Sequence, residues 1–185
     1  MRPATSPVVT NCPLTLRPLE LSDVSAWFEF AADPRVLLHT SAQVTQAADL
    51  LPIIERGLST ESGTPIHFAV CGSPDQRLIG VAGFHSISVL NKTAEITYTI
   101  HPAHWGRGFA SAVCGATTRW GFEQHGFVRI QATVLPPNRA SILVLERNGF
   151  LLEGIIRHFR IVRGEPRDYL MYSRLPADAD PLDHD

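Results

Sequence analysis

A glycine-rich turn directly before a long amphipathic segment is the clearest candidate for a functional site in the sequence. Gly106, Arg107 and Gly108 stand between a β-like run and a run of helical periodicity over Phe109–His125. A helix N-terminus exposes unpaired N–H groups and the positive end of the helix dipole, and glycine lets an anion approach that backbone closely. The turn therefore predicts a phosphate or pyrophosphate site with Arg107 as a charged partner. The alternative is a turn that only joins a strand to a helix.

Two common nucleotide-binding signatures do not fit this turn. The Rossmann fingerprint requires a third small residue, which the segment Gly106–Ser111 lacks at the proper place. The strand that follows ends at Leu135 and Pro136, without the acidic residue that would bind a ribose. The Walker A spacing GxxxxGK[ST] is also missing.

The elements that must position this turn alternate between strand and helix patterns. Apolar residues at helical spacing predict four helices, over residues 23–32, 45–58, 109–125 and 139–148. Alternating or β-branched runs predict strands over residues 14–19, 66–71, 78–89, 94–100, 128–135, 150–162 and 169–175. This order predicts an α/β protein with a mixed sheet and helices on both faces.

Size and composition indicate a single globular domain. The chain has 185 residues, of which 44% are apolar and 18% charged. A net charge of -2 argues against nucleic-acid binding. No apolar run approaches the ~20 residues of a membrane span, and the start of the chain does not resemble a secretory signal. We therefore expect a cytoplasmic protein without a membrane partner.

Charge is unevenly distributed along the chain. Residues 101–149 contain five arginines against two glutamates, which favours an anionic small molecule as ligand. Residues 176–185 contain four aspartates and no base, and we expect a flexible acidic tail there. Residues 1–13 are expected to be a second flexible tail, which leaves residues 14–175 as the domain.

Cysteine and histidine spacing argues against a metal site. Cys12, Cys71 and Cys114 are far apart and form no CxxC motif, so reduced thiols are expected. The eight histidines form no HExxH motif. His101 and His104 are the nearest pair, but they flank a proline. We expect no metal cofactor.

Two motifs carry a specific resemblance to a known family. HWGRGFASAV is followed about 30 residues later by PPNRASILVLERNGF, and this pair resembles the GNAT superfamily of acyl-CoA-dependent N-acetyltransferases. The most similar branch is the RimJ/RimL type, which acetylates the N-termini of ribosomal proteins. The segment LTLRPLELSDV also resembles the first strand and helix of that branch. The family's phosphate loop, Q/R-x-x-G-x-G/A, aligns with residues 105–110, where Trp105 departs from Gln or Arg. The resemblance covers about Leu14 to Leu175.

The resemblance implies a GNAT fold and acetyl-CoA as co-substrate. The fold would be a central, mostly antiparallel seven-stranded sheet flanked by about four helices, with a splayed strand pair for CoA. Pantetheine would pair near Thr99 and Ile100, a free amide there would polarise the thioester carbonyl, and Asn138 would bind the pantetheine arm. Arg147 or Arg139 would bind the 3′-phosphate. The backbone amides of residues 106–111 would hold the pyrophosphate, with Trp105 packed under the loop. The cofactor-binding loop would thus comprise Trp105, Gly106, Arg107, Gly108, Phe109, Ala110 and Ser111.

The resemblance also implies direct transfer of the acetyl group to a primary amine in a ternary complex. Ser141 matches the family position near the CoA sulfur and would protonate the leaving thiolate. Glu95 is the best acidic candidate for the general base, with His85 and His101 as rivals; the alternative for Glu95 is an exposed strand carboxylate. A lysine amine costs roughly 4.6 kcal/mol to deprotonate at pH 7, and an α-amine only roughly 1 to 1.4 kcal/mol.

These costs favour an α-amino acceptor, because no residue stands out as a strong base. The expected acceptor is therefore the N-terminus of a protein or peptide. Small-molecule amines such as amino acids, polyamines and aminoglycosides are alternatives, and so is a non-catalytic acyl-CoA-binding module. The protein is expected to be a monomer or a homodimer.

Overall fold

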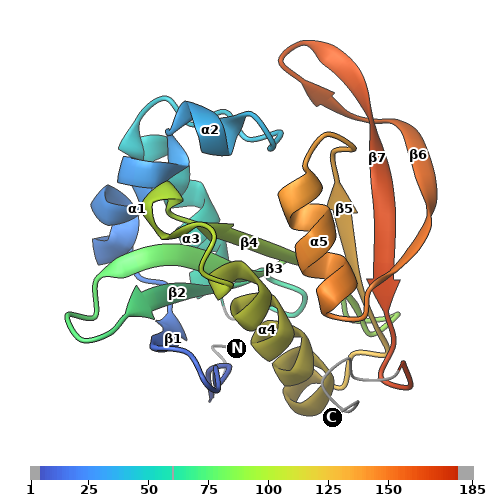
Figure 1. The fold of residues 1–185 in the computed structure, drawn as a ribbon, viewed down its shortest axis with the longest axis horizontal. Helices are drawn as coiled ribbons and strands as arrows, with labels where there is room; N and C mark the ends of the chain where they lie inside the picture. Colours follow the sequence, from blue (N-terminus) through green and yellow to red (C-terminus); the bar gives the residue numbers. More distant parts are fainter. Residues whose placement is uncertain (1–4, 60, 179–185) are drawn as a thin grey trace.

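A seven-stranded sheet forms the centre of the computed structural model, which describes residues 5–59 and 61–178 (Figure 1). The strand order is β1-β2-β3-β4-β5-β7-β6. Neighbouring strands are antiparallel except for β4 and β5, which run parallel. The strands are β1 Leu14–Pro18, β2 Ile66–Gly72, β3 Leu78–Ser88, β4 Thr93–Ile100, β5 Arg129–Val134, β6 Leu151–Val162 and β7 Glu165–Arg174.

The parallel pair at the centre of the sheet is short. β4 and β5 are paired at only three positions, the last of which is Glu95 with Gln131. Beyond that position β4 continues to Ile100 and β5 to Val134, and the two ribbons diverge (Figure 1). The expected splay between these strands is therefore present, and its open side lies at their C-terminal ends.

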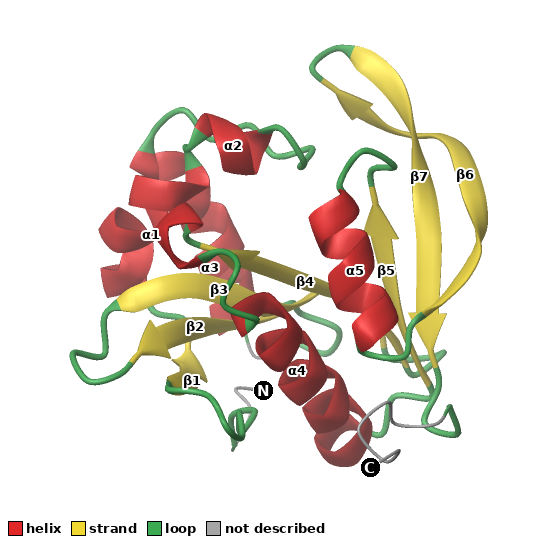
Figure 2. Ribbon diagram, in the orientation of Figure 1, coloured by secondary structure: helices red, strands yellow, loops and turns green. Residues whose placement is uncertain are grey.

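Helices cover both faces of the sheet, as expected (Figure 2). α4 and α5 pack on one face, against β3, β4 and β5, and α1 and α3 pack on the other, against β2 and β3. The described α-helices are α1 Val24–Ala31, α2 Pro34–Leu37, α3 Leu51–Leu58, α4 Phe109–His125 and α5 Arg139–Arg147. The mixed α/β fold class is confirmed.

Side-chain alternation along β4 assigns its residues to the two faces. Ala94 and Ile96 are buried in the core under α4, together with Trp120 of that helix. Because successive strand residues point to opposite faces, Glu95 points to the side of α1 and α3, and Tyr98 points to the side of α4 and α5. The two faces of β4 therefore present different chemistry to the splay.

The start of one helix, one additional helix and the start of one strand differ from the sequence prediction. The expected helix over 45–58 is a 3-10 turn, Ala47–Leu50, followed by α3, because the Asp49 carboxylate accepts the backbone N–H of Thr45 and Gln46 before the helix begins. The short helix α2 was not predicted, although Asp33 caps it by accepting the N–H of Arg35. β7 begins at Glu165 rather than at Tyr169.

The described part of the N-terminal segment lies against the domain. The indole N–H of Trp120 donates to Thr5 Oγ1 at 3.1 Å, and Val9 and Cys12 pack on the core. Residues 5–13, expected as a flexible tail, thus contribute to the surface around α4. In the expected acidic tail, residues 179–185 lie outside the described residues.

Candidate active site

The phosphate loop has the backbone geometry that an anion-binding helix start requires. Gly106 and Gly108 have φ of +75° and +76°, and Gly108 is the N-cap of α4. A Cβ at either position would meet no atom within 4 Å, so packing does not demand glycine there. Both positions are open to solvent and need glycine for their left-handed conformation. The loop therefore leaves the first N–H groups of α4 accessible, as the sequence predicts.

Trp105 is fixed by its indole nitrogen rather than by burial. Its Nε1–H donates to the carbonyl oxygen of Ile100 at 2.6 Å, while 47% of the residue remains exposed. The Arg35 guanidinium lies 5.8 Å from the ring centroid. Trp105 thus ties the loop to the end of β4, and the Arg35 guanidinium lies over its ring.

The backbone of β4 faces the splay at alternate residues. His101 N–H donates to the carbonyl of Ile79 on β3, so the next hydrogen-bonded pair along this antiparallel ladder is Thr99 with Val81. The alternate residues, Tyr98 and Ile100, turn their backbone groups toward β5. Of the two residues expected near pantetheine, Ile100 therefore directs its N–H into the splay and Thr99 uses its backbone in the sheet.

Two predicted residues meet at the N-terminus of α5. Asn138 Oδ1 accepts the backbone N–H of Ser141 at 3.1 Å, so Asn138 caps this helix. Ser141 Oγ lies 2.8 Å from the hydroxyl of Tyr98 on β4. Burial raises the pKa of the Tyr98 phenol well above its usual value, so the phenol is neutral. These contacts place a serine hydroxyl at the edge of the splay, next to the cap that pantetheine would approach.

Glu95 is buried rather than exposed, and the expectation of an exposed strand carboxylate is wrong. Only 7% of Glu95 is accessible, because the β6–β7 hairpin covers it. Its Oε1 accepts from Thr133 Oγ1 at 2.6 Å and from Arg160 Nη2 at 3.0 Å, and His85 Nε2 lies 3.5 Å away. All three contacts involve Oε1, which leaves Oε2 as the oxygen that an incoming amine could approach.

The two histidine rivals for the base lie in different surroundings. Burial and the Arg160 charge lower the pKa of His85, although Glu95 opposes them, so His85 is neutral at pH 7. His101 is the cap of a 3-10 turn, and its Nδ1 accepts the N–H of Ala103 at 3.0 Å. His85 therefore keeps the chemistry of a base near Glu95, and His101 has a structural role.

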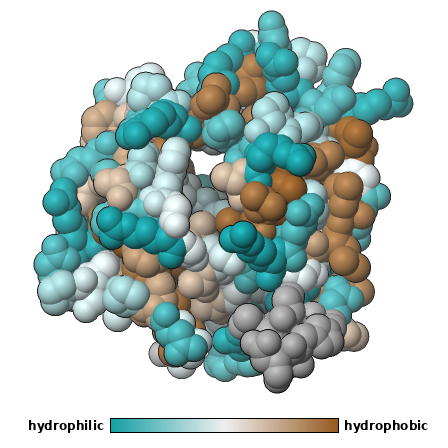
Figure 3. All heavy atoms as spheres, in the orientation of Figure 1, coloured by the Kyte–Doolittle hydropathy of each residue, from teal (hydrophilic) through white to brown (hydrophobic). Residues whose placement is uncertain are grey.

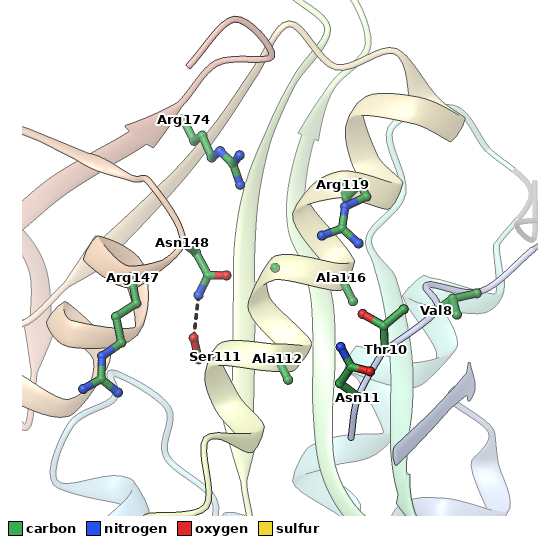
Figure 4. A pocket seen from close by; sticks show the side chains of 11 residues that line it. Val8, Thr10, Asn11, Ser111, Ala112, Ala116, Arg119, Arg147, Asn148 and Arg174 are labelled. Atoms are coloured by element: carbon green, nitrogen blue, oxygen red, sulfur yellow. Dashed lines mark hydrogen bonds between the residues drawn. The ribbon is translucent and has the colours of Figure 1, made fainter. Parts of the chain in front are cut away.

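A basic pocket of about 260 Å³ lies beside the first turns of α4. It contains Arg147, which was expected near the 3′-phosphate, and Arg119 and Arg174, which were not expected (Figure 4). Ser111 and Asn148 join α4 to α5 at its rim, with Asn148 Nδ2 donating to Ser111 Oγ at 3.0 Å. Its lining residues include three arginines and no carboxylate, which suits a phosphate ester. Arg139 lies outside this lining, at the opposite end of α5.

The surface is hollowed where β4 and β5 diverge. Figure 3 shows an opening bounded by the regions of α2, α5 and the β6–β7 hairpin. The hairpin reaches α2, because Arg163 Nη2 donates to the carbonyl of Leu37. The opening therefore gives access to the splay.

The sequence reasoning missed the partners of its two catalytic candidates. Tyr98 contacts Ser141, and Arg160 and Thr133 contact Glu95. Alternation along β4 placed Tyr98 and Glu95 on opposite faces and could have indicated that Tyr98 faces α5. The approach of Arg160 depends on the fold of the hairpin, which spacing does not reveal.

The described residues contain neither a metal-binding cluster nor a membrane-spanning helix. Within residues 5–59 and 61–178, no group of three or more His, Cys, Asp or Glu side chains could hold a metal ion. None of the described helices is both long and apolar enough to span a bilayer. The three cysteines are free thiols.

Known proteins are similar to this chain in sequence and in fold. Residues 13–151 match the family model of the acetyltransferase (GNAT) domain. An uncharacterized N-acetyltransferase, p20, from Bacillus licheniformis is 34% identical over 169 residues, which are 89% of this chain and 94% of that protein. A ribosomal-protein-serine acetyltransferase from Escherichia coli is 33% identical over 55% of this chain and 56% of its own length.

A solved structure supports the fold independently of close sequence similarity. Spermidine N-acetyltransferase from Vibrio cholerae, in complex with CoA and spermine, superposes with a TM-score of 0.79 over 92% of this chain and 98% of its own, at 21% identity. The resemblance to ribosomal-protein acetyltransferases is confirmed by the relatives, which include one such enzyme. With the family match across most of the domain, the splayed strands and the glycine-capped helix, the chain belongs to the GNAT acetyltransferases and is an N-acetyltransferase that uses acetyl-CoA.

Proposed function

We propose that this enzyme acetylates the α-amino group of a protein or peptide N-terminus. The proposal is carried by the side chains on the acceptor side of the splay, by which we mean the face of β4 on which Glu95 lies. Glu95 is the buried carboxylate there, and it is already paired with Arg160. Since Oε1 already accepts from Thr133 and Arg160, only Oε2 remains to accept a proton from an amine, and α-amines need the least help in losing one.

The cofactor residues fit acetyl-CoA at three places. The open N–H groups after Gly108 suit the pyrophosphate, and the Ile100 amide in the splay suits pantetheine and the thioester oxygen. Ser141 lies at the edge of the same splay. We infer that the basic pocket with Arg119 and Arg147 binds the 3′-phosphate, because it begins at Ser111, one turn into α4.

In the transfer, the chain supplies orientation and hydrogen bonds rather than a covalent intermediate. The amine nitrogen attacks the acetyl carbonyl, while the backbone N–H of Ile100 stabilises the developing oxyanion. Ser141 interacts with the departing thiolate. The amine loses its proton to Glu95 Oε2, to the neutral His85 or to water, all of which lie on or reach the acceptor side.

Charge at the opening argues against a polyamine acceptor. The β6–β7 hairpin contains five arginines against three acidic residues, and one of these arginines, Arg160, is paired with Glu95. A spermidine-like polycation would meet net positive charge there, at an energetic cost. The solved spermidine acetyltransferase shares the fold with this chain, and the basic hairpin favours a peptide over such a substrate.

The test is release of free CoA thiol from acetyl-CoA with a panel of amines. Peptides with varied N-termini, the same peptides with blocked N-termini and one internal lysine, spermidine and an aminoglycoside form the panel, and mass spectrometry locates the acetyl group. We expect turnover with free N-termini. Turnover confined to polyamines or to lysine side chains would contradict the proposal. Tight CoA binding without turnover on any amine would favour a non-catalytic acyl-CoA-binding module. The cytoplasmic location stays a prediction.

A further inference from the structure

Two hydroxyl groups meet at the edge of the splay from elements far apart in sequence. Tyr98 lies on β4 and Ser141 in the first turn of α5, and 43 residues separate them. Their oxygen atoms are 2.8 Å apart, and the Tyr98 hydroxyl is 3.3 Å from the Ser141 carbonyl oxygen. The contact joins the strand that faces the thioester to the helix that faces the sulfur.

The distances indicate which hydrogen bond uses the phenol proton. A separation of 2.8 Å is typical of an O–H···O hydrogen bond, and 3.3 Å exceeds the usual range. A phenol has one hydrogen to donate. Either hydroxyl of the 2.8 Å pair could be the donor. When the Tyr98 hydroxyl donates to Ser141 Oγ, the hydrogen of Ser141 is left to point elsewhere.

The remaining direction for the Ser141 hydrogen is the splay. Ser141 N–H already donates to the Asn138 side chain, which fixes the first turn of α5. With Tyr98 on one side of Oγ, the free hydrogen can reach an atom in the space between β4 and β5. Burial keeps the Tyr98 phenol neutral, so Tyr98 retains the hydrogen with which it can orient the serine.

We propose that Tyr98 is a positioning residue that directs the Ser141 hydroxyl toward the sulfur of CoA. The inference rests on the proposed function and adds a residue to it. In the transfer step the N–C bond forms and the C–S bond breaks, with the electron pair remaining on sulfur. The amine proton passes to Glu95, His85 or water, and Ser141 donates a hydrogen bond to the thiolate.

The first experiment measures the ionisation of bound CoA and needs no turnover. The ultraviolet absorbance of the thiolate gives the thiol pKa of CoA, free and bound to the protein. We expect the bound thiol to be more acidic than the free thiol. Ser141→Ala and Tyr98→Phe should each lower the acid dissociation constant of the bound thiol about tenfold, as expected for a lost hydrogen bond to a charged group.

A matched control is available in the same core. Tyr172 is also buried, on β7, and its hydroxyl lies 3.3 Å from Glu146 rather than near Ser141. Tyr172→Phe also removes a phenolic oxygen and should leave the pKa of the bound thiol unchanged. An equal change in Tyr172→Phe, or none in Tyr98→Phe, would overturn the proposal.

The second experiment is a double-mutant cycle on turnover. Tyr98→Phe should lower kcat about fivefold or more with the KM for acetyl-CoA unchanged, and it should have no further effect in a Ser141→Ala background. Equal losses in both backgrounds would show that Tyr98 acts independently of Ser141. Melting temperatures of Tyr98→Phe and Tyr172→Phe separate loss of folding from loss of positioning.

The two experiments distinguish this inference from the proposed function. A wild-type protein that acidifies bound CoA through Tyr98 and Ser141, yet acetylates no amine, would support the hydroxyl pair and refute the amine transfer. Turnover of N-terminal peptides, with the pKa of bound CoA thiol equal to that of free CoA, would support the amine transfer and refute the role of the hydroxyl pair.

Discussion

Glu95 and Arg160 meet at the acceptor side of the splay, with 3.0 Å between Glu95 Oε1 and Arg160 Nη2, although 65 residues separate them in sequence. The contact joins the central strand β4 to the edge strand β6. Arg160 also lies over the rings of Phe159 and Tyr169, at 5.0 and 5.5 Å from their centroids. One guanidinium thus holds the hairpin over the site and neutralises the carboxylate that faces the acceptor.

Removing this arginine should destabilise the protein. Arg160→Met keeps the aliphatic stem and leaves Glu95 buried without its cation, which should cost about 1 to 3 kcal/mol, less than for a fully buried pair because Arg160 is 31% exposed. Denaturant unfolding measures the change. Arg167→Met is the control, since its pair with Glu165 is exposed and should contribute below about 1 kcal/mol. Equal losses in the two variants would show that burial of Glu95 is energetically unimportant.

The phosphate loop can be tested with a carboxylate. Gly108→Asp places negative charge against the expected pyrophosphate, so the affinity for CoA should fall at least about tenfold, or about 1.4 kcal/mol. Calorimetry measures the affinity. Gly126→Asp is matched, because Gly126 also has a positive φ and open space but lies at the other end of α4. A folded Gly108→Asp variant with unchanged CoA affinity would remove the loop from the site.

The basic pocket predicts discrimination between CoA and dephospho-CoA. Arg147→Ala and Arg119→Ala should each weaken CoA binding about fivefold or more and leave dephospho-CoA binding unchanged, because the lost charge–phosphate contact exists only in CoA. Arg139→Ala, at the other end of α5, is the comparison. If Arg139→Ala alone shows this discrimination, the 3′-phosphate binds away from the pocket.

The burial of His67 leads us to expect that the protein loses stability in mild acid. Burial is the main cause that lowers its pKa from 6.5 to about 4, with the nearby charges of His85 and Arg56 adding to the effect. The unfolded chain therefore binds more protons between these values, so stability is complete above pH 6.5 and falls as pH approaches 4. The expected loss is about 3 kcal/mol.

Unfolding curves between pH 7 and 4 test this expectation. His67→Gln should flatten the dependence. His158→Asn, at an exposed position whose positive φ asparagine tolerates, should leave it intact. An unchanged slope in His67→Gln would assign the acid sensitivity to other groups.

The acceptor should determine the pH dependence of turnover. For an N-terminal peptide, kcat/KM should rise with pH and level off near 8, the usual pKa of an α-amine. Peptides whose α-amines differ in pKa should shift the plateau accordingly, and Glu95→Gln should cost less than about tenfold. A plateau that stays fixed across these peptides would identify a base on the enzyme.

Local chemistry explains which parts of the site the sequence predicts. Gly108 and Gly126 mark the ends of α4 because both have the left-handed conformation that glycine adopts without strain. Asn138 marks the start of α5 because its side chain caps the helix. These signals lie within a few residues of the feature that they specify, so the strand–loop–helix frame follows from the sequence.

Long-range contacts explain what the sequence does not predict. The Tyr98 hydroxyl and the Arg160 guanidinium find their partners 43 and 65 residues away. Periodicity indicates the face on which each side chain lies, but the distance between two faces depends on how the hairpin and α5 pack. The burial of Glu95 is therefore a tertiary property.

The brief pairing of β4 with β5 has a mechanical consequence. Three residue positions join the half of the sheet that contains β1 to β4 with the half that contains β5, β7 and β6. α4 and α5 add a second connection through Asn148 and Ser111. A pantetheine chain between the strands would add a further connection, so the cofactor itself would complete the sheet where its strand pairing is shortest.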